Sequence, residues 1–207
     1  MTAEDITALF TRADGSFQFA RWGRPIAPIV FGLDDASLAN LKGAIEAMVL
    51  HVGHQMAETD PELGSNAMFF FFQNWDELLA VPDLDKMIPD LPDLVARLSA
   101  QKAGQYRLFR FDDAGAIRAC FSFIRVDQTL LAEPLEAVSL SLAIQIMLAW
   151  GPKAFETQTP LAQTPSGEIV VHPRLHALLQ AAYDPVLPAT NSDASHALRL
   201  AARLGRV

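Results

Sequence analysis

The chain of 207 residues contains a single cysteine, Cys120. One cysteine cannot build a disulfide framework or a zinc site made of several thiolates, so both kinds of scaffold are excluded. Cys120 lies within the alternating segment 118–126, which is typical of a half-buried strand. A small buried hydrophobic role therefore fits Cys120 better than the role of a nucleophile.

Three common catalytic motifs are missing as well. No segment has the glycine spacing and Lys-Ser/Thr ending of a phosphate-binding loop, and no strand leads into a Gly-x-Ser-x-Gly turn. A His-Glu-x-x-His zinc helix is also absent. Because each of these motifs has strict spacing requirements, their absence argues against the enzyme classes that depend on them.

Positive charge is scarce. The chain has 16 lysines and arginines against 24 aspartates and glutamates, a formal net charge of −8. Phosphate backbones and anionic lipids repel such a chain, so we expect neither nucleic acid nor a membrane as a partner. A protein partner or a homodimer stays open.

Long hydrophobic runs are also lacking. The most apolar stretch, EAVSLSLAIQIMLAWG at 136–151, is shorter than the roughly 20 residues that a bilayer-spanning helix needs. It is apolar on nearly every side, which predicts a helix in the middle of a core. The first residues, MTAEDITALF, are acidic where a signal peptide is basic, so we expect a cytoplasmic protein.

What the sequence does contain predicts one α+β domain over residues 1–207, with a mixed or antiparallel sheet packed with several helices. Hydrophobic residues make up 51% and charged residues 19%, as in a chain with a sizeable core. The segment DDAG joins two alternating runs and is the strongest hairpin signal. The predicted strands are 16–20, 26–32, 66–73, 105–111 and 116–127, and the main predicted helices are 2–12, 33–60, 134–150, 172–184 and 191–205.

The best candidate metal ligands lie near the end of the long helix predicted over 33–60. His51, His54 and Glu58 follow one another at i, i+3 and i+7, which would place them on one helix face. Two imidazoles and a carboxylate are a ligand set for zinc or iron. The alternative is a solvated face whose histidines interact with the helix dipole.

A second candidate site combines cationic and aromatic residues. Arg21, Trp22 and Arg24 form a loop that could bind a carboxylate or a partner, although arginine packing on tryptophan explains the pattern equally well. Trp75 and Trp22, together with Phe69–Phe72, could instead line a pocket for a small molecule. Aromatic runs of this kind also form ordinary core.

The C-terminal third resembles the ending of an uncharacterised bacterial domain family that looks like divergent zincin-type metallopeptidases. The segment AYDPVLP at 182–188 matches a Leu-Tyr-Asp-Pro-x-Leu-x-Pro element that follows a His-led helix. RWGRPIAPIVFG, NAMFFFFQNWDEL and ACFSFIRVD are similar to the family's upstream strands and turns. The order of elements agrees from about residue 21 to residue 204, and the resemblance implies a zincin-like fold.

The same resemblance implies that the active-site helix is degenerate here. In such proteins the helix after the cysteine-containing strand carries a Glu-Glu-x-x-Gln-x-Leu-Gly segment. Its counterpart places Ile144 and Gln145 at the two carboxylate positions and Leu148 at the glutamine position. A glutamine amide cannot act as a general base, and isoleucine or leucine cannot bind a metal.

These observations leave three hypotheses for the function. The first is a non-catalytic zincin-like domain that acts through binding or assembly. The second is a metal-dependent hydrolase that uses His51, His54 and Glu58. The third is a small-molecule binding module. A cofactor is not identified by the sequence, and the second hypothesis predicts a bound zinc or iron ion.

Overall fold

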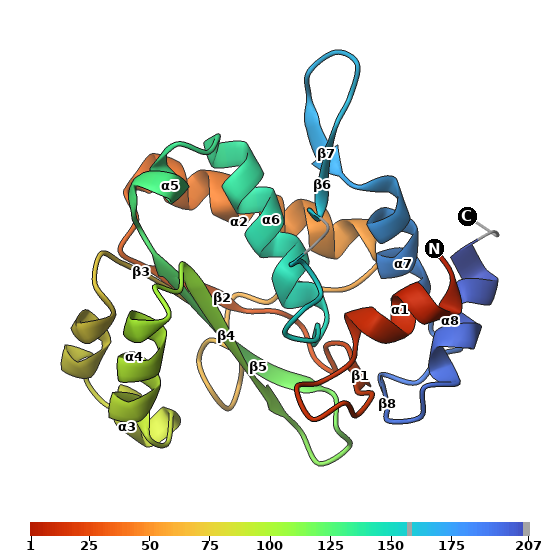
Figure 1. The fold of residues 1–207 in the computed structure, drawn as a ribbon, viewed down its shortest axis with the longest axis horizontal. Helices are drawn as coiled ribbons and strands as arrows, with labels where there is room; N and C mark the ends of the chain where they lie inside the picture. Colours follow the sequence, from red (N-terminus) through yellow and green to blue (C-terminus); the bar gives the residue numbers. More distant parts are fainter. Residues whose placement is uncertain (157–158, 205–207) are drawn as a thin grey trace.

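A computed structural model describes residues 1–156 and 159–204 of the chain. Its centre is a four-stranded sheet in which three neighbouring strands run parallel and the fourth pairs antiparallel at one edge (Figure 1). The sheet is therefore mixed, and the predicted α+β class is confirmed. In spatial order the strands are β2 (Pro28–Phe31), β3 (Ala67–Phe72), β5 (Ile117–Arg125) and β4 (Gln105–Phe111).

The phenylalanine run forms the centre of this sheet. Successive side chains of a strand point to opposite faces, so a strand covered on both sides must be apolar at every position. Phe69 of β3 lies in one hydrophobic cluster, and Phe70 and Phe72 lie in another. Strand β3 is therefore covered on both faces, within the range 66–73 that the sequence predicts as a strand.

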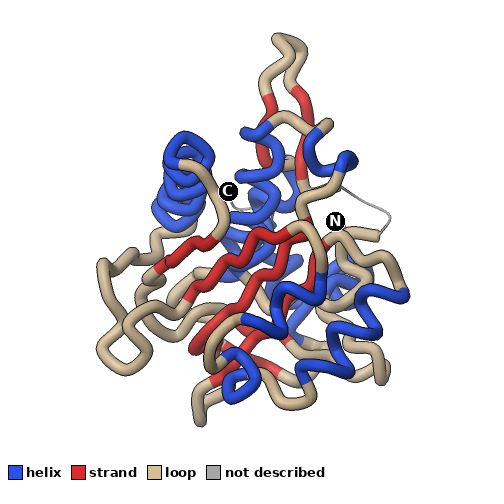
Figure 2. Tube along the Cα trace, turned by 90° about the vertical axis from the view of Figure 1, so that its left-hand side faces the viewer, coloured by secondary structure: helices blue, strands red, loops and turns tan. Residues whose placement is uncertain are grey.

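Helices cover both faces of the sheet (Figures 1 and 2). The first layer, with α2 and α6, shares a core with Phe69 and Ile124, and the second layer packs on Phe70 and Phe121. In the chain, the second layer lies between β3 and β4. Strand β4 then forms with β5 the hairpin that the DDAG turn predicted. The first layer contains α2 (Asp35–His51) and α6 (Leu135–Met147), and the second contains η1 (Trp75–Ala80), α3 (Leu84–Met87) and α4 (Leu91–Ala100).

The apolar helix α6 lies in the core, as the sequence predicts, but it is shorter than expected. Its last residue is Met147, and Leu148 is extended and forms a bridge with Arg21. The N–H of Ala149 donates to the carbonyl of Ala20, so pairing with a distant segment ends the helix. Among the described residues, no helix has both the length and the apolar character to cross a membrane.

The long helix α2 also ends earlier than predicted. Asp34 caps its first turn by accepting from two backbone N–H groups. The last helical residue is His51, and Gly53 adopts a φ of +69°. Glycine reaches this left-handed conformation without steric cost and commonly stops a helix there. Residues 54–60 therefore do not continue the helix, and the predicted end at residue 60 is wrong.

The remaining elements complete the first layer and the rim. Thr2 and Asp5 form a capping box at the first helix. The predicted strand 16–20 is shorter than expected, and a hairpin over residues 161–171 lies where the sequence analysis predicts no strand. The last helix begins after its predicted start, and its predicted end at Gly205 lies outside the described residues. The elements are α1 (Ala3–Leu9), β1 (Phe19–Ala20), α5 (Gln128–Leu131), β6 (Leu161–Gln163), β7 (Ile169–Val171), α7 (Pro173–Ala182), β8 (Thr190–Asn191) and α8 (His196–Leu204).

Candidate functional site

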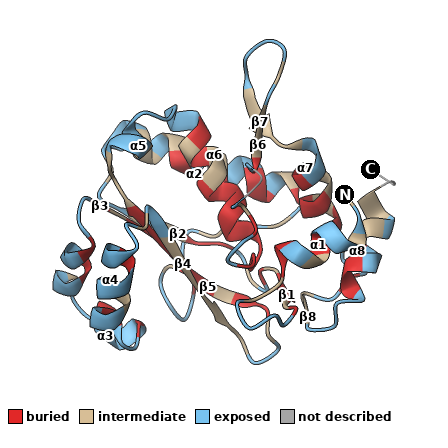
Figure 3. Ribbon diagram, in the orientation of Figure 1, coloured by how far each residue is buried: buried red, intermediate tan, exposed pale blue. Residues whose placement is uncertain are grey.

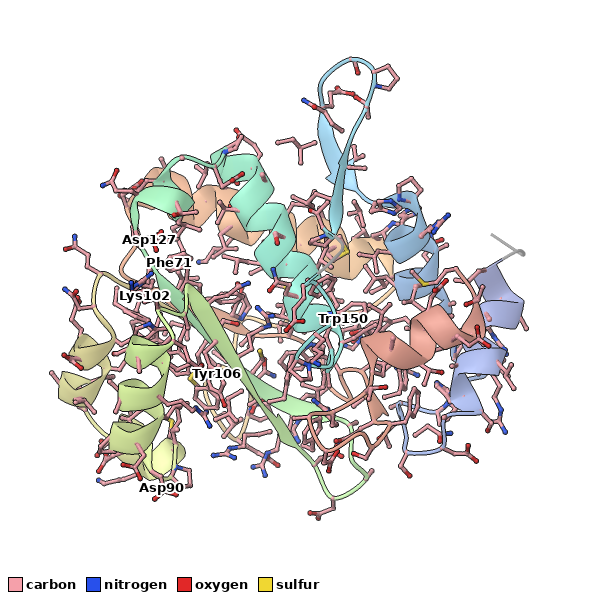
Figure 4. All side chains as sticks on the ribbon, in the orientation of Figure 1. Phe71, Asp90, Lys102, Tyr106, Asp127 and Trp150 are labelled. Atoms are coloured by element: carbon pink, nitrogen blue, oxygen red, sulfur yellow. The ribbon has the colours of Figure 1, made fainter. Side chains whose placement is uncertain are left out.

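A cavity of about 590 Å³ lies where the C-terminal end of β5 meets α5 and α6. Asp127 and Lys102, labelled in Figure 4, are among its lining residues. The carboxyl ends of the parallel strands are where open α/β sheets place their ligand sites, and the volume falls in the range of small-molecule pockets. The cavity therefore lies at the edge of the sheet where ligand sites are common, although the sequence carries no catalytic motif there.

One part of the cavity wall is apolar, and charged and other polar side chains line the rest. Ile124, Ala137 and Leu142 are buried side chains that line it from β5 and α6. Leu130 of α5 and Leu161 of β6 are half-buried and extend the same surface. A ligand placed here would gain roughly 25 cal/mol for each Å² of apolar surface removed from water.

Gln145 introduces a polar group into this apolar part of the wall. Its side chain lines the cavity but is only 4% exposed. The Nε2 atom donates to Ser141 Oγ, one helical turn earlier, at 2.7 Å. The Oε1 atom is buried and has no hydrogen-bond partner within the described part of the chain. A buried amide oxygen in this state costs about 1–3 kcal/mol.

Charges of both signs surround the open end. Arg125 Nη2 donates to Asp127 Oδ2 at 2.7 Å and to the backbone carbonyl of Lys102 at 3.4 Å. Asp127 also caps α5 by accepting from the N–H of Leu130. That N–H and the Arg125 guanidinium hold the pKa of Asp127 below its ordinary value. Glu133 adds an exposed acid to the lining.

This arrangement is suited to binding. The described lining residues include no cysteine or histidine, and Ser141 has no base among them other than the carboxylates at the open end. Cys120 lies in the sheet, where burial raises the pKa of its thiol to about 12. The thiol is therefore protonated at neutral pH, which matches its predicted hydrophobic role.

The predicted metal ligands do not share a helix face, because α2 ends at His51. His54 follows the helix end, and its Nε2 pairs with the backbone carbonyl of Arg24 at 2.9 Å. His51 instead stacks on His176 of α7, with ring centroids 3.9 Å apart; burial and this neighbour lower the pKa of His51. Within the described ranges, Glu58 and these histidines belong to no group of three or more potential ligands.

The predicted cationic and aromatic residues are engaged in packing and internal pairs. Trp22 is fully buried and donates to the carbonyl of Ile146, and Arg21 lies over the ring of Tyr183 at 5.4 Å. Arg24 pairs with Asp60 at 3.3 Å and with Glu62 at 3.1 Å.

Trp75 lies on the opposite side of the sheet from Trp22. It packs with Phe70 and Phe72, while Trp22 packs with Phe69. The two tryptophans and the phenylalanine run therefore do not line one pocket, because the sheet itself separates them. The cavity described above lies elsewhere, along α6.

Of the three positions that the family resemblance marks as degenerate, the structure brings only one to the cavity. Ile144 and Leu148 are completely buried, and Leu148 lies beyond the end of α6. Gln145 lines the cavity. The sequence signal for this site was the pair of polar residues at i and i+4, Ser141 and Gln145, within an otherwise apolar helix.

Comparison with known proteins gives no match for this chain, whether with protein-family models, with curated proteins or with solved structures. The resemblance to a zincin-like bacterial family therefore stays a prediction.

Proposed function

We propose that this protein is a non-catalytic binding domain that holds a small amphipathic molecule in the cavity between β5, α5 and α6. The observation that carries this proposal is the buried amide of Gln145, which lines the cavity beside Leu142 and leaves its Oε1 without a partner among the described residues. A folded chain tolerates such a group where a ligand or function compensates for its cost.

The amide can serve a ligand in either orientation. A half-turn about its last side-chain bond exchanges Oε1 and Nε2, and the hydroxyl of Ser141 can donate to one or accept from the other. The atom that Ser141 leaves free then pairs with a hydroxyl, amide or carbonyl group of the ligand. The apolar part of the ligand packs on Leu142 and its neighbours.

The other hypotheses have less support. A hydrolase built on His51, His54 and Glu58 requires a shared helix face, and α2 ends before two of these residues. Zincin-like ancestry, a protein partner or homodimer, a cytoplasmic location and the exclusion of nucleic acid remain predictions from the sequence.

The test compares two tryptophan variants of α6. Val138 and Leu140 are both half-buried, but only Val138 lines the cavity. Val138→Trp should fill the cavity, whereas Leu140→Trp changes the same helix outside it. A library of small amphipathic fragments is screened by ligand-observed NMR against the wild type and both variants.

We expect fragments that bind the wild type and Leu140→Trp but not Val138→Trp. The proposal is wrong if no fragment binds the wild type, or if Val138→Trp binds the same fragments with unchanged affinity. Circular dichroism of both variants establishes that a loss of binding is not a loss of fold.

A further inference from the structure

A histidine at the start of α8 is buried without any hydrogen bond. His196 is 0% exposed, and its ring lies against the ring of Phe19 from β1, with centroids 4.5 Å apart. Neither Nδ1 nor Nε2 has a partner within the described part of the chain. In this position the neutral imidazole leaves one donor and one acceptor without a partner, and a protonated imidazolium would bury a charge and two donors with no acceptor.

The charges around His196 offer no compensation for a proton. Arg199 and Arg203 lie on the same helix, and together with burial they lower the pKa of His196. The helix start also disfavours positive charge, because the macrodipole is positive there.

The acidic groups of the neighbouring elements are engaged elsewhere. Asp184, after α7, accepts from Arg203 at 2.6 Å, and Asp193 accepts from the N–H of Ser195 at 2.8 Å. Asp5 of α1 pairs with the backbone of Thr2. The other charged or titratable groups on the packed helices are Glu4 of α1 and Arg174 and His176 of α7, and β1 and β8 carry none.

The helix that His196 anchors is the last one that the structure describes. α8 packs on α1 and α7 (Figure 1) through one apolar side, with Ala197 and Leu200 buried and Leu198 exposed (Figure 3). The main contacts of α8 are with α1 and α7 and not with the central sheet. Such an element opens at a lower free energy than the whole domain, and its opening would expose His196 to water while the sheet stays intact.

We propose that His196 is an acid-sensitive contact: proton uptake by its ring releases α8 from α1 and α7. The contact is complete above the ordinary histidine pKa of about 6.5, and it weakens as the pH falls toward the lower folded-state pKa. The opening of α8 takes up one proton in this window. The ratio of docked to open α8 therefore falls about tenfold for each unit by which the pH is lowered. The carboxylates of Asp184 and Asp193 have lowered pKa values, so they contribute only below about 3.8.

The test is hydrogen exchange of the full chain followed by mass spectrometry between pH 7.5 and 5.0. Exchange is expressed as protection factors, which remove the pH dependence of the intrinsic rate. We expect protection in α8 to fall by up to about tenfold between pH 6.5 and 5.5, and this fall is compared with that of the same helix in His196→Met. His196→Met fills the same buried space with an apolar side chain and should make α8 protection independent of pH in this window.

His176→Gln is the matched control. It removes a histidine from α7, a neighbouring helix, and should leave the acid response of α8 as in the wild type. The proposal is overturned if α8 protection in the wild type does not change with pH, or if the fall persists in His196→Met. Should His196→Met fail to fold, the His196 ring is followed by NMR in the wild type, and titration at the ordinary value of about 6.5 would contradict the proposal.

Discussion

Replacing Gln145 by methionine should stabilise the protein while it weakens ligand binding. Methionine preserves the length and approximate volume of the side chain but removes the amide. Removing a buried oxygen without a partner returns about 1–3 kcal/mol, and losing the bond to Ser141 costs about 0.5–1.5 kcal/mol. The net expectation is a gain of about 1 kcal/mol in the free energy of unfolding.

For a chain of this size, 1 kcal/mol corresponds to a rise of about 2–4 °C in Tm. The assay is urea and thermal unfolding followed by circular dichroism, without ligand. Gln180 provides the control, because its Oε1 is also buried without a partner but lies on α7, outside the cavity. Gln180→Met should also raise stability, and only Gln145→Met should change fragment binding.

One result would refute this reasoning. If Gln145→Met lowers the free energy of unfolding by more than about 1 kcal/mol, the amide oxygen makes a favourable hydrogen bond in the folded protein. An ordered water would be its partner, and the Oε1 atom of Gln145 would then need no ligand to satisfy it. A gain in stability together with unchanged fragment affinity would instead separate Gln145 from the binding site.

Three further predictions concern stability. Gly32→Ala should destabilise the protein by several kcal/mol in urea unfolding, since φ is +86° and a Cβ would lie 2.2 Å from the carbonyl oxygen of Phe71. Gly43→Ala, at an open position within α2, should instead stabilise the protein by about 1 kcal/mol. Equal effects of the two substitutions on the free energy of unfolding would contradict this account. Asn66→Ala should lower the free energy of unfolding by about 2–4 kcal/mol, because this buried side chain forms hydrogen bonds with two backbone groups and with Asp60. A loss below about 1 kcal/mol would show that water takes the place of the side chain in these hydrogen bonds. Burial alone would raise the pKa of Asp60, but hydrogen bonds from backbone N–H groups, Asn66 and Arg24 lower it to about 2. Its contribution to stability is therefore complete above about 3.8 and is lost as the pH falls toward 2, and Asp60→Asn should reduce the slope of stability against pH in that range.

Local patterns predicted most of the elements. The DDAG hairpin, the phenylalanine strand and the apolar helix each follow from residues that are neighbours in the chain. The errors occur where distant segments compete with local preference. Leu148 continues the apolar pattern of α6, yet it leaves the helix to pair with Arg21. Gly53 marked the end of α2, but the apolar and histidine pattern continued past it and suggested a longer helix.

The site was less predictable than the fold. Its walls come from the α4–β4 connection, β5, α5, α6 and β6, and no local pattern joins Lys102, Arg125 and Gln145. Only Ser141 and Gln145 are separated by one helical turn and could be noticed as a pair. The prediction of a shared metal-binding face depended on a single assumption, the continuation of α2 through Glu58, and α2 ends at His51.

The doubly buried strand β3 has a consequence for how the chain folds. The β4–β5 hairpin joins strands that are neighbours in the chain and can form early. Strand β3 is separated from β5 in the chain by η1, α3, α4 and β4, so the pairing of β3 with β5 closes a longer loop and forms later. Until then the uncharged segment Ala67–Phe72 lies exposed, with strong strand preference and no gatekeeping charge within it. The residues that complete the centre of the native sheet are thus also those most prone to pair with a second chain during synthesis, and folding must bury them before such pairing occurs.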